Sequence, residues 1–264
     1  MARSTYYRHL SHPEHVTRAD LEPLIAAVWG RTANGCGHRQ IHMCLVHEFG
    51  RRVSAKTVLR VMRRMGLKCR IRAANPWRKY SSYRGEDGER VPNLLKRDFR
   101  ADGPFAKLGT DVTEFKVAGV KAYLAPVYDM ASKEIMAWDV SRHPDMEQQK
   151  RLLAMLAPKL PAGASPVLHS DMGWQYQHPW WRERLGELGI RQSMSRKGNC
   201  LDNAATEQVF DHLKDEFYRD REFDSYERFK AELDDYIIHW NTKRRQIRLG
   251  GRTPEEFRRA STVV

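Results

Sequence analysis

The chain has 264 residues, 41% of them hydrophobic, and a formal net charge of +13 at pH 7. This length is typical of one or two domains, and the apolar content is sufficient for a packed core. The apolar runs are far shorter than the roughly 20 residues that span a bilayer, and we find no signal peptide, so no membrane association is expected. The four cysteines are scattered without a C-x-x-C pair, which argues against a disulfide framework or a zinc site and favours the cytosol.

The positive charge is concentrated in one part of the chain. Residues 51–100 contain 16 Lys and Arg but 4 Asp and Glu, whereas residues 101–264 contain 25 of each kind. Such a basic block suits a polyanionic partner, because each neutralised phosphate releases counterions. The alternative is a basic face that only keeps the protein soluble.

Residues 17–67 follow an N-terminal tail (residues 1–16) and are predicted to form three helices. Apolar residues recur at helical spacing in the first two, and Ser54 is a suitable N-cap for the third, after a turn at Gly50. The free face of the third helix carries Lys56, Arg60, Arg63 and Arg64. A basic helix that follows another helix and a turn has what binding to a DNA groove or to phosphates requires. The alternative is a basic helix packed against its own domain.

Residues 68–103 are basic and interrupted by Pro and Gly, so we interpret them as a linker. Their aromatic residues Trp77, Tyr80 and Tyr83 can stack on bases or simply pack. A plain solvated tether is an equal alternative.

Beginning at Lys107, the pattern changes to strands. The segments KLGTDVTEFKV, KAYLAPVYDM and KEIMAWDV are rich in β-branched and aromatic residues and are separated by turn signals near Gly119 and Ser132. We expect them to form an antiparallel meander.

Helices and strands alternate after this meander. Residues 145–156 and 180–188 have helical patterns, and short apolar segments that end at Asp171 and Ser193 are typical of strands. Strands followed by alternating helices and strands predict an α/β fold with a mixed sheet and flanking helices.

Three acidic residues stand out in this part. Asp111 lies within the first strand segment, Asp171 lies just past a buried strand, and Glu207 lies on an amphipathic helix whose expected N-cap is Asp202 or Asn203. The apolar stripe of that helix is Thr206, Val209, Phe210, Leu213 and Phe217. Between Asp171 and Glu207 there are 35 residues, but a chain with 33 acidic residues contains such pairs by chance. The spacing alone therefore does not identify a site, and the sequence around the three acids has to be considered.

Four strings surround these residues in order: GTDVTEF, HSDMGWQY, SMSRKGNCLDNAATEQVFDHLKDE and WNTKRRQIRLGGRTPEEF. Together with the upstream helices they cover nearly the whole chain, and they resemble the insertion-sequence-three family of transposases, second reading frame. That family shares its catalytic core with retroviral integrases. The resemblance implies a ribonuclease-H-like core over residues 104–264 with C-terminal helices, preceded by a small all-helical, helix-turn-helix-like domain at residues 17–67.

The resemblance also implies catalytic, metal-binding roles for Asp111, Asp171 and Glu207. Carboxylates gathered this closely would repel, and hard cations with oxygen ligands remove that cost, so two Mg²⁺ or Mn²⁺ ions are expected. Two ions about 4 Å apart can activate the attacking oxygen and stabilise the leaving oxygen of a phosphoryl transfer. For His169 and His212, packing or a phosphate contact is expected before metal binding.

The remaining implied site residues are DNA contacts: Arg196, Lys197, Lys214 and Arg244. Gly198 would let its loop approach DNA closely. The chain departs from the family pattern at Gln246, where His is usual, and at Leu108, where Trp is frequent. Neither change removes a carboxylate, but the first leaves the role of the C-terminal segment open.

The sequence as a whole indicates a DNA transposase that cuts element ends and joins 3′-hydroxyls to target DNA. The alternatives are a DNA-binding regulator or inhibitor derived from a transposase, and a metal-dependent nuclease without strand transfer. The resemblance implies element ends and target DNA as partners, a homo-oligomer on DNA, and a bacterial cytoplasmic, nucleoid-associated location. The string RSTYYRHL resembles a segment that follows an upstream-frame helix-turn-helix, so an upstream-frame transposase protein is a further expected partner.

Overall fold

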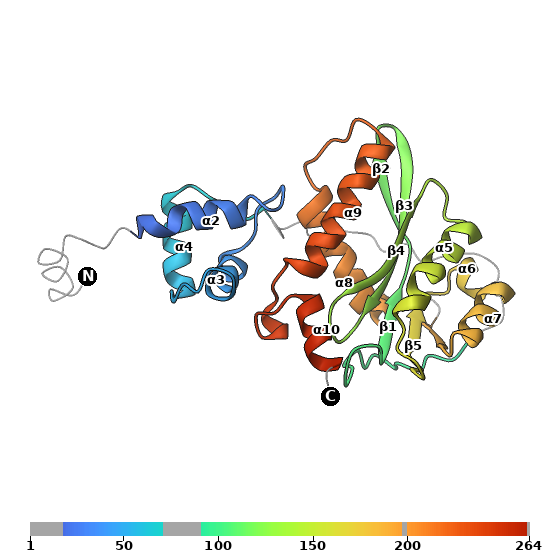
Figure 1. The fold of residues 1–264 in the computed structure, drawn as a ribbon. Coiled ribbons are helices and arrows are strands. Elements are labelled where there is room, and N and C mark those ends of the chain that lie inside the picture. The colour runs from blue at the N-terminus through green and yellow to red at the C-terminus, as the bar shows by residue number, and fades with distance from the viewer. Residues whose placement is uncertain (1–17, 71–90, 197–199, 263–264) are drawn as a thin grey trace, which may run out of the picture. The chain divides into compact units, whose positions relative to one another are not determined.

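The computed structural model describes residues 18–70, 91–196 and 200–262, and the chain divides after Arg70 into two compact units (Figure 1). The expectations for the N-terminal tail, for the aromatic residues of the linker and for Lys197 lie outside the described residues. None of the described helices combines the length and the apolarity needed to cross a bilayer.

The first unit is built from helices, as predicted. Its core consists of side chains from all three main helices, with Ile25, Ile41 and Val58 fully buried. Gly50 has a φ of +62° at the expected turn, and the Ser54 hydroxyl accepts a hydrogen bond from Thr57 N at 3.1 Å, which confirms the N-cap. The elements are η1 (Ala19–Leu21), α2 (Glu22–Trp29), α3 (His38–His47) and α4 (Ala55–Arg64).

The second unit contains a six-stranded mixed sheet. The antiparallel meander is confirmed: β3 pairs with β4 on one side and with both β1 and β2 on the other. The strands β5 and β6 continue the sheet in parallel with β1, in the order β1-β5-β6. The strands are β1 (Lys107–Thr110), β2 (Thr113–Val117), β3 (Val120–Asp129), β4 (Ile135–Ser141), β5 (Val167–Ser170) and β6 (Arg191–Met194).

Helices cover both faces of this sheet, and each face has its own apolar core (Figure 1). On one face lie α8 (Ala204–Leu213), the π-helical turn η4 (Lys214–Tyr218) and α9 (Tyr226–Thr242). The opposite face packs against α5 (Met146–Leu156) and α7 (Pro179–Glu187). The remaining described elements are η2 (Ala157–Lys159), α6 (Trp174–Gln177), η3 (Cys200–Asn203), η5 (Ile247–Leu249) and α10 (Pro254–Thr262).

The structure differs from the sequence prediction at the first strand. The segment KLGTDVTEFKV is interrupted at Asp111 and Val112, so that β1 and β2 pair with different parts of β3. The interruption frees the backbone next to Asp111, whose own carboxylate accepts the Val112 N–H at 2.7 Å. A side chain takes over a bond that a continuous strand would give to its neighbour.

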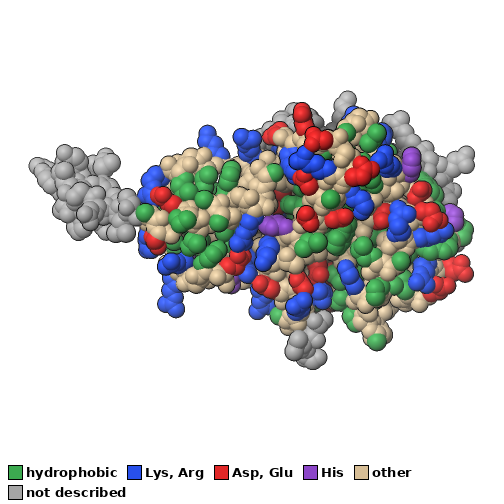
Figure 2. Space-filling view, turned by 45° about the horizontal axis from the view of Figure 1, so that its top comes forward, with side chains coloured by type: hydrophobic (Ala, Val, Ile, Leu, Met, Phe, Trp, Pro, Cys, Tyr) green, Lys and Arg blue, Asp and Glu red, His purple; other side chains and the backbone are tan. Residues whose placement is uncertain are grey.

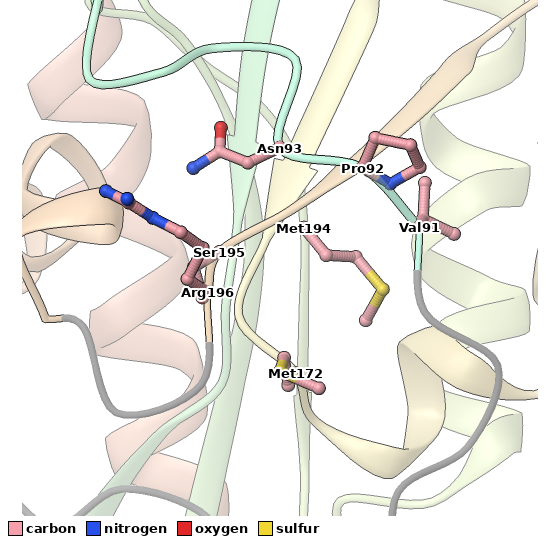
Figure 3. A pocket seen from close by; sticks show the side chains of 7 residues that line it. All are labelled: Val91, Pro92, Asn93, Met172, Met194, Ser195 and Arg196. Atoms are coloured by element: carbon pink, nitrogen blue, oxygen red, sulfur yellow. The ribbon is translucent and has the colours of Figure 1, made fainter.

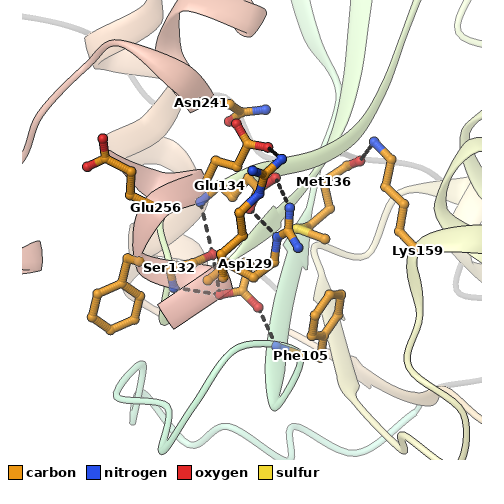
Figure 4. A network of polar contacts seen from close by, with 12 residues as sticks. Phe105, Asp129, Ser132, Glu134, Met136, Lys159, Asn241 and Glu256 are labelled. Carbon is orange, nitrogen blue, oxygen red and sulfur yellow. Dashed lines mark hydrogen bonds and ion pairs between the residues drawn. The ribbon is translucent and has the colours of Figure 1, made fainter. Parts of the chain in front are cut away.

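The C-terminal segment is anchored on the sheet by polar side chains (Figure 4). Asn241 on α9 binds both the N–H and the C=O of Ile135 at 2.9 Å, and Trp240 Nε1 donates to the carbonyl of Lys133. Arg258 on α10 forms an ion pair of 2.6 Å with Glu134. The string WNTKRR therefore fixes the C-terminal helices to the core.

Arg244 belongs to the same anchoring set. Its guanidinium forms three hydrogen bonds with the buried Glu216 carboxylate, at 2.5, 2.9 and 3.1 Å, and stacks 4.1 Å from the centre of the Trp240 ring. Burial alone would raise the pKa of Glu216, but Arg244 and the Tyr236 hydroxyl hold that pKa below its usual value.

Substitution of Arg244 by Met is expected to destabilise the core by about 3–5 kcal/mol, because it leaves the Glu216 carboxylate buried without a counter-charge. In wild type the lowered pKa stabilises the fold above the unfolded-state pKa, and this is lost as pH falls through the folded-state pKa. In the variant the pKa of Glu216 should be raised, so its stability falls as pH rises. The free-energy difference from wild type, measured by denaturant unfolding, should therefore shrink toward low pH.

The matched control is the double variant Glu216→Gln/Arg244→Met, which should recover much of the loss because no charge remains buried. If Arg244→Met unfolds like wild type at neutral pH, the ion pair contributes no stability.

Candidate active site

Two of the three acidic residues meet at one edge of the sheet. The strands β1 and β5 are parallel neighbours with Gly109 opposite His169, and Asp111 and Asp171 each follow the last residue of their strand. The carboxyl ends of parallel neighbours lie at the same edge. The structure therefore brings Asp111 and Asp171 together from distant parts of the chain.

Glu207 reaches this edge because α8 crosses β1 at very short range. A Cβ atom added to Gly109 would lie 2.6 Å from the Thr206 hydroxyl, so a side chain at this position would push the helix away. Thr206 is buried against the strand, and Glu207 follows it at a half-buried position. The predicted apolar stripe of α8 is confirmed, since all five of its residues are buried.

The three carboxylates influence one another electrostatically. Burial raises the pKa of Asp111 well above its ordinary value, and the negative charges of Asp171 and Glu207 raise it further. Hydrogen bonds from Val112 N–H and from the Asn203 amide, at 3.0 Å, act in the opposite direction.

The other two carboxylates are shifted in the same direction. Burial raises the pKa of Asp171, and a hydrogen bond of 2.9 Å from Gly173 N–H partly offsets the effect. Burial and the neighbouring Asp211 raise the pKa of Glu207. All three sites therefore favour either protonation or a bound cation.

The donor set fits a hard divalent cation. It consists of carboxylate oxygens, and the buried Oδ1 atom of Asn203 beside Asp111 has no hydrogen-bond partner among the described residues. Within the described residues, however, no three His, Cys, Asp or Glu side chains form a closed metal-binding group. Hydrogen bonds from Asn203 and Gly173 occupy one oxygen each of Asp111 and Asp171.

The start of α8 differs from the sequence prediction. Asn203 is the N-cap residue, but no side chain caps the helix. The Asn203 amide binds Asp111 instead, and the fully buried Asp202 accepts hydrogen bonds from Arg196, Arg97 and Asn93. These bonds keep the pKa of Asp202 low, despite some opposition from burial. Sequence reasoning gave Asp202 only a possible capping role and missed its role in this network, because its partners lie up to 109 positions away.

His169 connects the same elements and is not available as a metal ligand. Its Nε2 donates to the carbonyl of Asp202 at 2.9 Å, and its Nδ1 lies 2.9 Å from the Ser193 hydroxyl. Burial lowers the pKa of His169, which keeps the ring neutral. The expectation of packing is confirmed for His169, while His212 packs near Trp240 and lies 3.8 Å from Glu216.

A small cavity of about 260 Å³ lies between the segment before β1 and the chain that follows β5 and β6 (Figure 3). Arg196 at its rim is exposed but ion-paired with Asp202 at 2.9 Å. The cavity is lined by Val91, Pro92, Asn93, Met172, Met194, Ser195 and Arg196. Residues 91–103, which the sequence places at the end of the linker, thus pack against this unit.

The expected DNA contacts have different surroundings. Lys214 is half-buried with its Nζ 5.3 Å from the centre of the Phe115 ring, and Arg244 is buried against Glu216. The Arg244 guanidinium is largely buried and paired with Glu216, so this residue anchors the core, and its contact with DNA stays a prediction.

The basic face of α4 is open to solvent. Lys56, Arg60 and Arg63 are exposed, and Arg64 forms an ion pair of 2.5 Å with Glu22. In the face shown in Figure 2, basic side chains are exposed on both units, and acidic ones stand among them on the larger unit. This agrees with the charge balance of residues 101–264.

Comparisons with known proteins agree with this architecture. Residues 101–200 and 207–261 match models of the integrase core domain, and residues 17–75 match a model of an HTH-like domain. The sheet order, with an antiparallel meander followed by two strands parallel to the first, is the ribonuclease-H-like fold of that core. The fold and the matches define an integrase-type protein with a helix-turn-helix-like DNA-binding unit.

Proteins of similar sequence define the class of this protein more narrowly. The chain is 42% identical to the "Putative transposase InsK for insertion sequence element IS150" of Escherichia coli, over 97% of this chain and 89% of that one. It is 34% identical to "Transposase InsF for insertion sequence IS3A", also of Escherichia coli, over 77% and 70%. A solved structure with some likeness is the HTLV-2 integrase catalytic core domain in complex with magnesium, with a TM-score of 0.47, 14% identity, and coverage of 60% and 99%. The protein belongs to the insertion-sequence-three family of transposases.

Replacement of Asp111 by Asn is expected to stabilise the protein at pH 8 without divalent ions, because it removes one of three mutually repelling charges. A carboxyl whose folded-state pKa is raised stabilises the fold at low pH, and this contribution is lost as pH rises through that pKa. The gain in Tm should therefore shrink as the pH falls and should be absent below the usual Asp pKa of about 3.9, where the carboxyl is protonated in both the folded and the unfolded state. Calorimetry across pH measures this difference.

Asp145→Asn, at the N-cap of α5 away from the carboxylates, is the control and should show no such gain. An Asp111→Asn variant that melts below wild type at pH 8 without divalent ions would contradict the repulsion.

Proposed function

We propose that the protein cleaves DNA at the ends of an insertion sequence and joins the 3′-hydroxyls to target DNA, with Asp111, Asp171 and Glu207 as catalytic residues. The observation that carries this proposal is that Asp111 and Asp171 follow neighbouring parallel strands and that the charges of Asp171 and Glu207 both act on Asp111. Burial raises the pKa of all three carboxylates. Perturbed acids of this kind gather at functional sites.

Each residue has a distinct part in the proposed reaction. The three carboxylates would hold two Mg²⁺ or Mn²⁺ ions, which would supply activation of the attacking oxygen and stabilisation of the leaving oxygen. Asn203 holds one oxygen of Asp111, and Gly173 N–H holds one oxygen of Asp171, so the backbone and an amide orient both carboxylates. The close packing of α8 on Gly109 keeps Glu207 at the site.

DNA contacts divide between the two units in this proposal. Lys56, Arg60 and Arg63 on the exposed face of α4 would bind the phosphates of the element ends. Near the carboxylates, Arg196, Lys197 and Lys214 would bind phosphates next to the reacting one. We further propose that the active form is a homo-oligomer on DNA and that an upstream-frame protein takes part.

The Glu207→Gln variant is expected to lose cleavage and joining by at least about 10³-fold, since several kcal/mol of charge stabilisation disappear at about 1.4 kcal/mol per tenfold. Binding to the same DNA should persist. Labelled element-end DNA with Mg²⁺ or Mn²⁺ measures both, and Glu183→Gln on the exposed side of α7 is the isosteric control.

Full activity in the Glu207→Gln variant would overturn the catalytic assignment. If wild type produces cut but no joined product from a supplied 3′-hydroxyl strand, the protein is a nuclease. Binding without reaction in both proteins would indicate a regulator, or the need for the upstream-frame protein.

Substitution of Arg60 by Ala is expected to weaken DNA binding uniformly across sequences. Each lost phosphate contact should reduce the slope of log K against log salt by about 0.9 on duplex DNA. The control is Arg184→Ala on α7, which removes the same charge from the other unit. Equal slopes for the two variants would remove α4 from the interface.

A further inference from the structure

A second basic feature lies on the catalytic unit, away from the DNA contacts considered so far. It is a groove of about 930 Å³, formed by residues 96–101, the turn after β3 (residues 128–133), the first turn of α8 and Arg248 in η5. One acidic residue, Asp98, lines it. The cations that line it are Lys96, Arg97, Arg100, Lys133 and Arg248.

The protein neutralises these cations only in part: Arg97 is paired with Asp202 at 2.9 Å, and Asp129 partly offsets the charge of Lys133. Asp98 is already shared between Lys107 at 3.1 Å and Arg100 at 3.5 Å. Within the described residues, the side chains of Lys96 and Arg248 have no acidic partner. Lys133 faces Arg248, and burial together with that neighbouring charge lowers the pKa of Lys133. Cations that repel across a groove favour an anionic ligand.

The groove is held in shape by the core. The Asn93 side chain accepts a hydrogen bond of 2.9 Å from Lys96 N, which fixes the turn that carries Lys96. On the other side, Leu249 is buried and positions Arg248, while Trp240 Nε1 binds the carbonyl of Lys133. A rigid arrangement loses little entropy when a ligand binds.

Two adjacent residues connect this groove to the catalytic carboxylates. Asn203 binds Asp111 at 3.0 Å, and Asp202 binds Arg97 at 2.9 Å. On the next turn, Gln208 lines the groove and directly follows Glu207. A strand that leaves the carboxylates across the first turn of α8 would therefore enter the groove.

We propose that this groove binds the sugar–phosphate backbone of the DNA strand adjoining the phosphate at the catalytic carboxylates. The proposal rests on the proposed function, which supplies DNA as the ligand. The cations suit phosphate ligands, and the small side chains of Ala204 and Ala205 let the backbone approach the start of the helix. In this assignment Arg248 makes a C-terminal DNA contact.

The test compares DNA binding of Lys96→Ala/Arg248→Ala with that of Lys150→Ala/Arg184→Ala. Both double variants lose two positive charges from this unit. The second pair lies on α5 and α7, which cover the opposite face of the sheet, and its members form ion pairs with Glu147 and Glu187 on their own helices. All variants carry Glu207→Gln, so that binding is measured on the full chain without reaction. The slope of log K against log salt should fall by about 1.8 on duplex DNA, or about 1.4 on a single strand, in the groove pair alone.

Equal slopes and affinities for the two pairs would overturn the proposal, including the case in which the groove receives an acidic protein segment. Circular dichroism and unfolding curves verify that both pairs are folded. Failure of the groove proposal can be told apart from failure of the proposed function. Lys96→Ala/Arg248→Ala with Glu207 intact is tested separately for cleavage. An active Glu207→Gln variant would refute the catalytic assignment, whatever the groove binds.

Discussion

The contact between Gly109 and Thr206 is the constraint on which the site depends. Without it, α8 would stand farther from β1, and Glu207 would lose the proximity that raises the pKa of Asp111. The same contact sets the position of Asn203, one turn before Thr206, so the orientation of Asp111 depends on it too. The absence of a side chain at Gly109 on β1 thereby determines the position of the Glu207 carboxylate on α8.

Charge is distributed around this contact in two ways. Asp111, Asp171 and Glu207 share an edge with no basic side chain hydrogen-bonded to any of them among the described contacts, whereas the nearby Asp202 is fully paired with Arg97 and Arg196. Asp202 is therefore held in its charged form by guanidinium groups, whereas the three carboxylates have no such counter-charge among the described residues. Asp202 and Asn203 are adjacent in sequence: Asp202 forms the ion pairs with Arg97 and Arg196, and Asn203 binds the unpaired carboxylate of Asp111.

Much of this organisation could be predicted from the sequence, and the exceptions have a common physical reason. The order of strands and helices followed from periodicity, and the candidate site followed from the resemblance of the four strings around the acids to a known family. The interruption at Asp111, the role of Asp202 and the burial of Arg244 did not, because each depends on a partner brought close by tertiary packing. Arg244 and Arg248 are both basic residues near the end of the chain, and packing on Glu216 alone separates an interior anchor from a groove residue.

The side chains that anchor the C-terminal segment also cover one edge of the sheet. Among the described strands, β4 has one neighbour, β3, and its other edge would offer unpaired backbone groups to a second chain. Asn241 occupies both groups of Ile135, and Lys159 and Tyr226 donate to the carbonyls of Met136 and Val140. These side chains substitute for a missing strand and block edge-to-edge aggregation. A shortened protein that ends before α9 would expose this edge, so truncated products of the gene should be prone to aggregate rather than to compete for DNA.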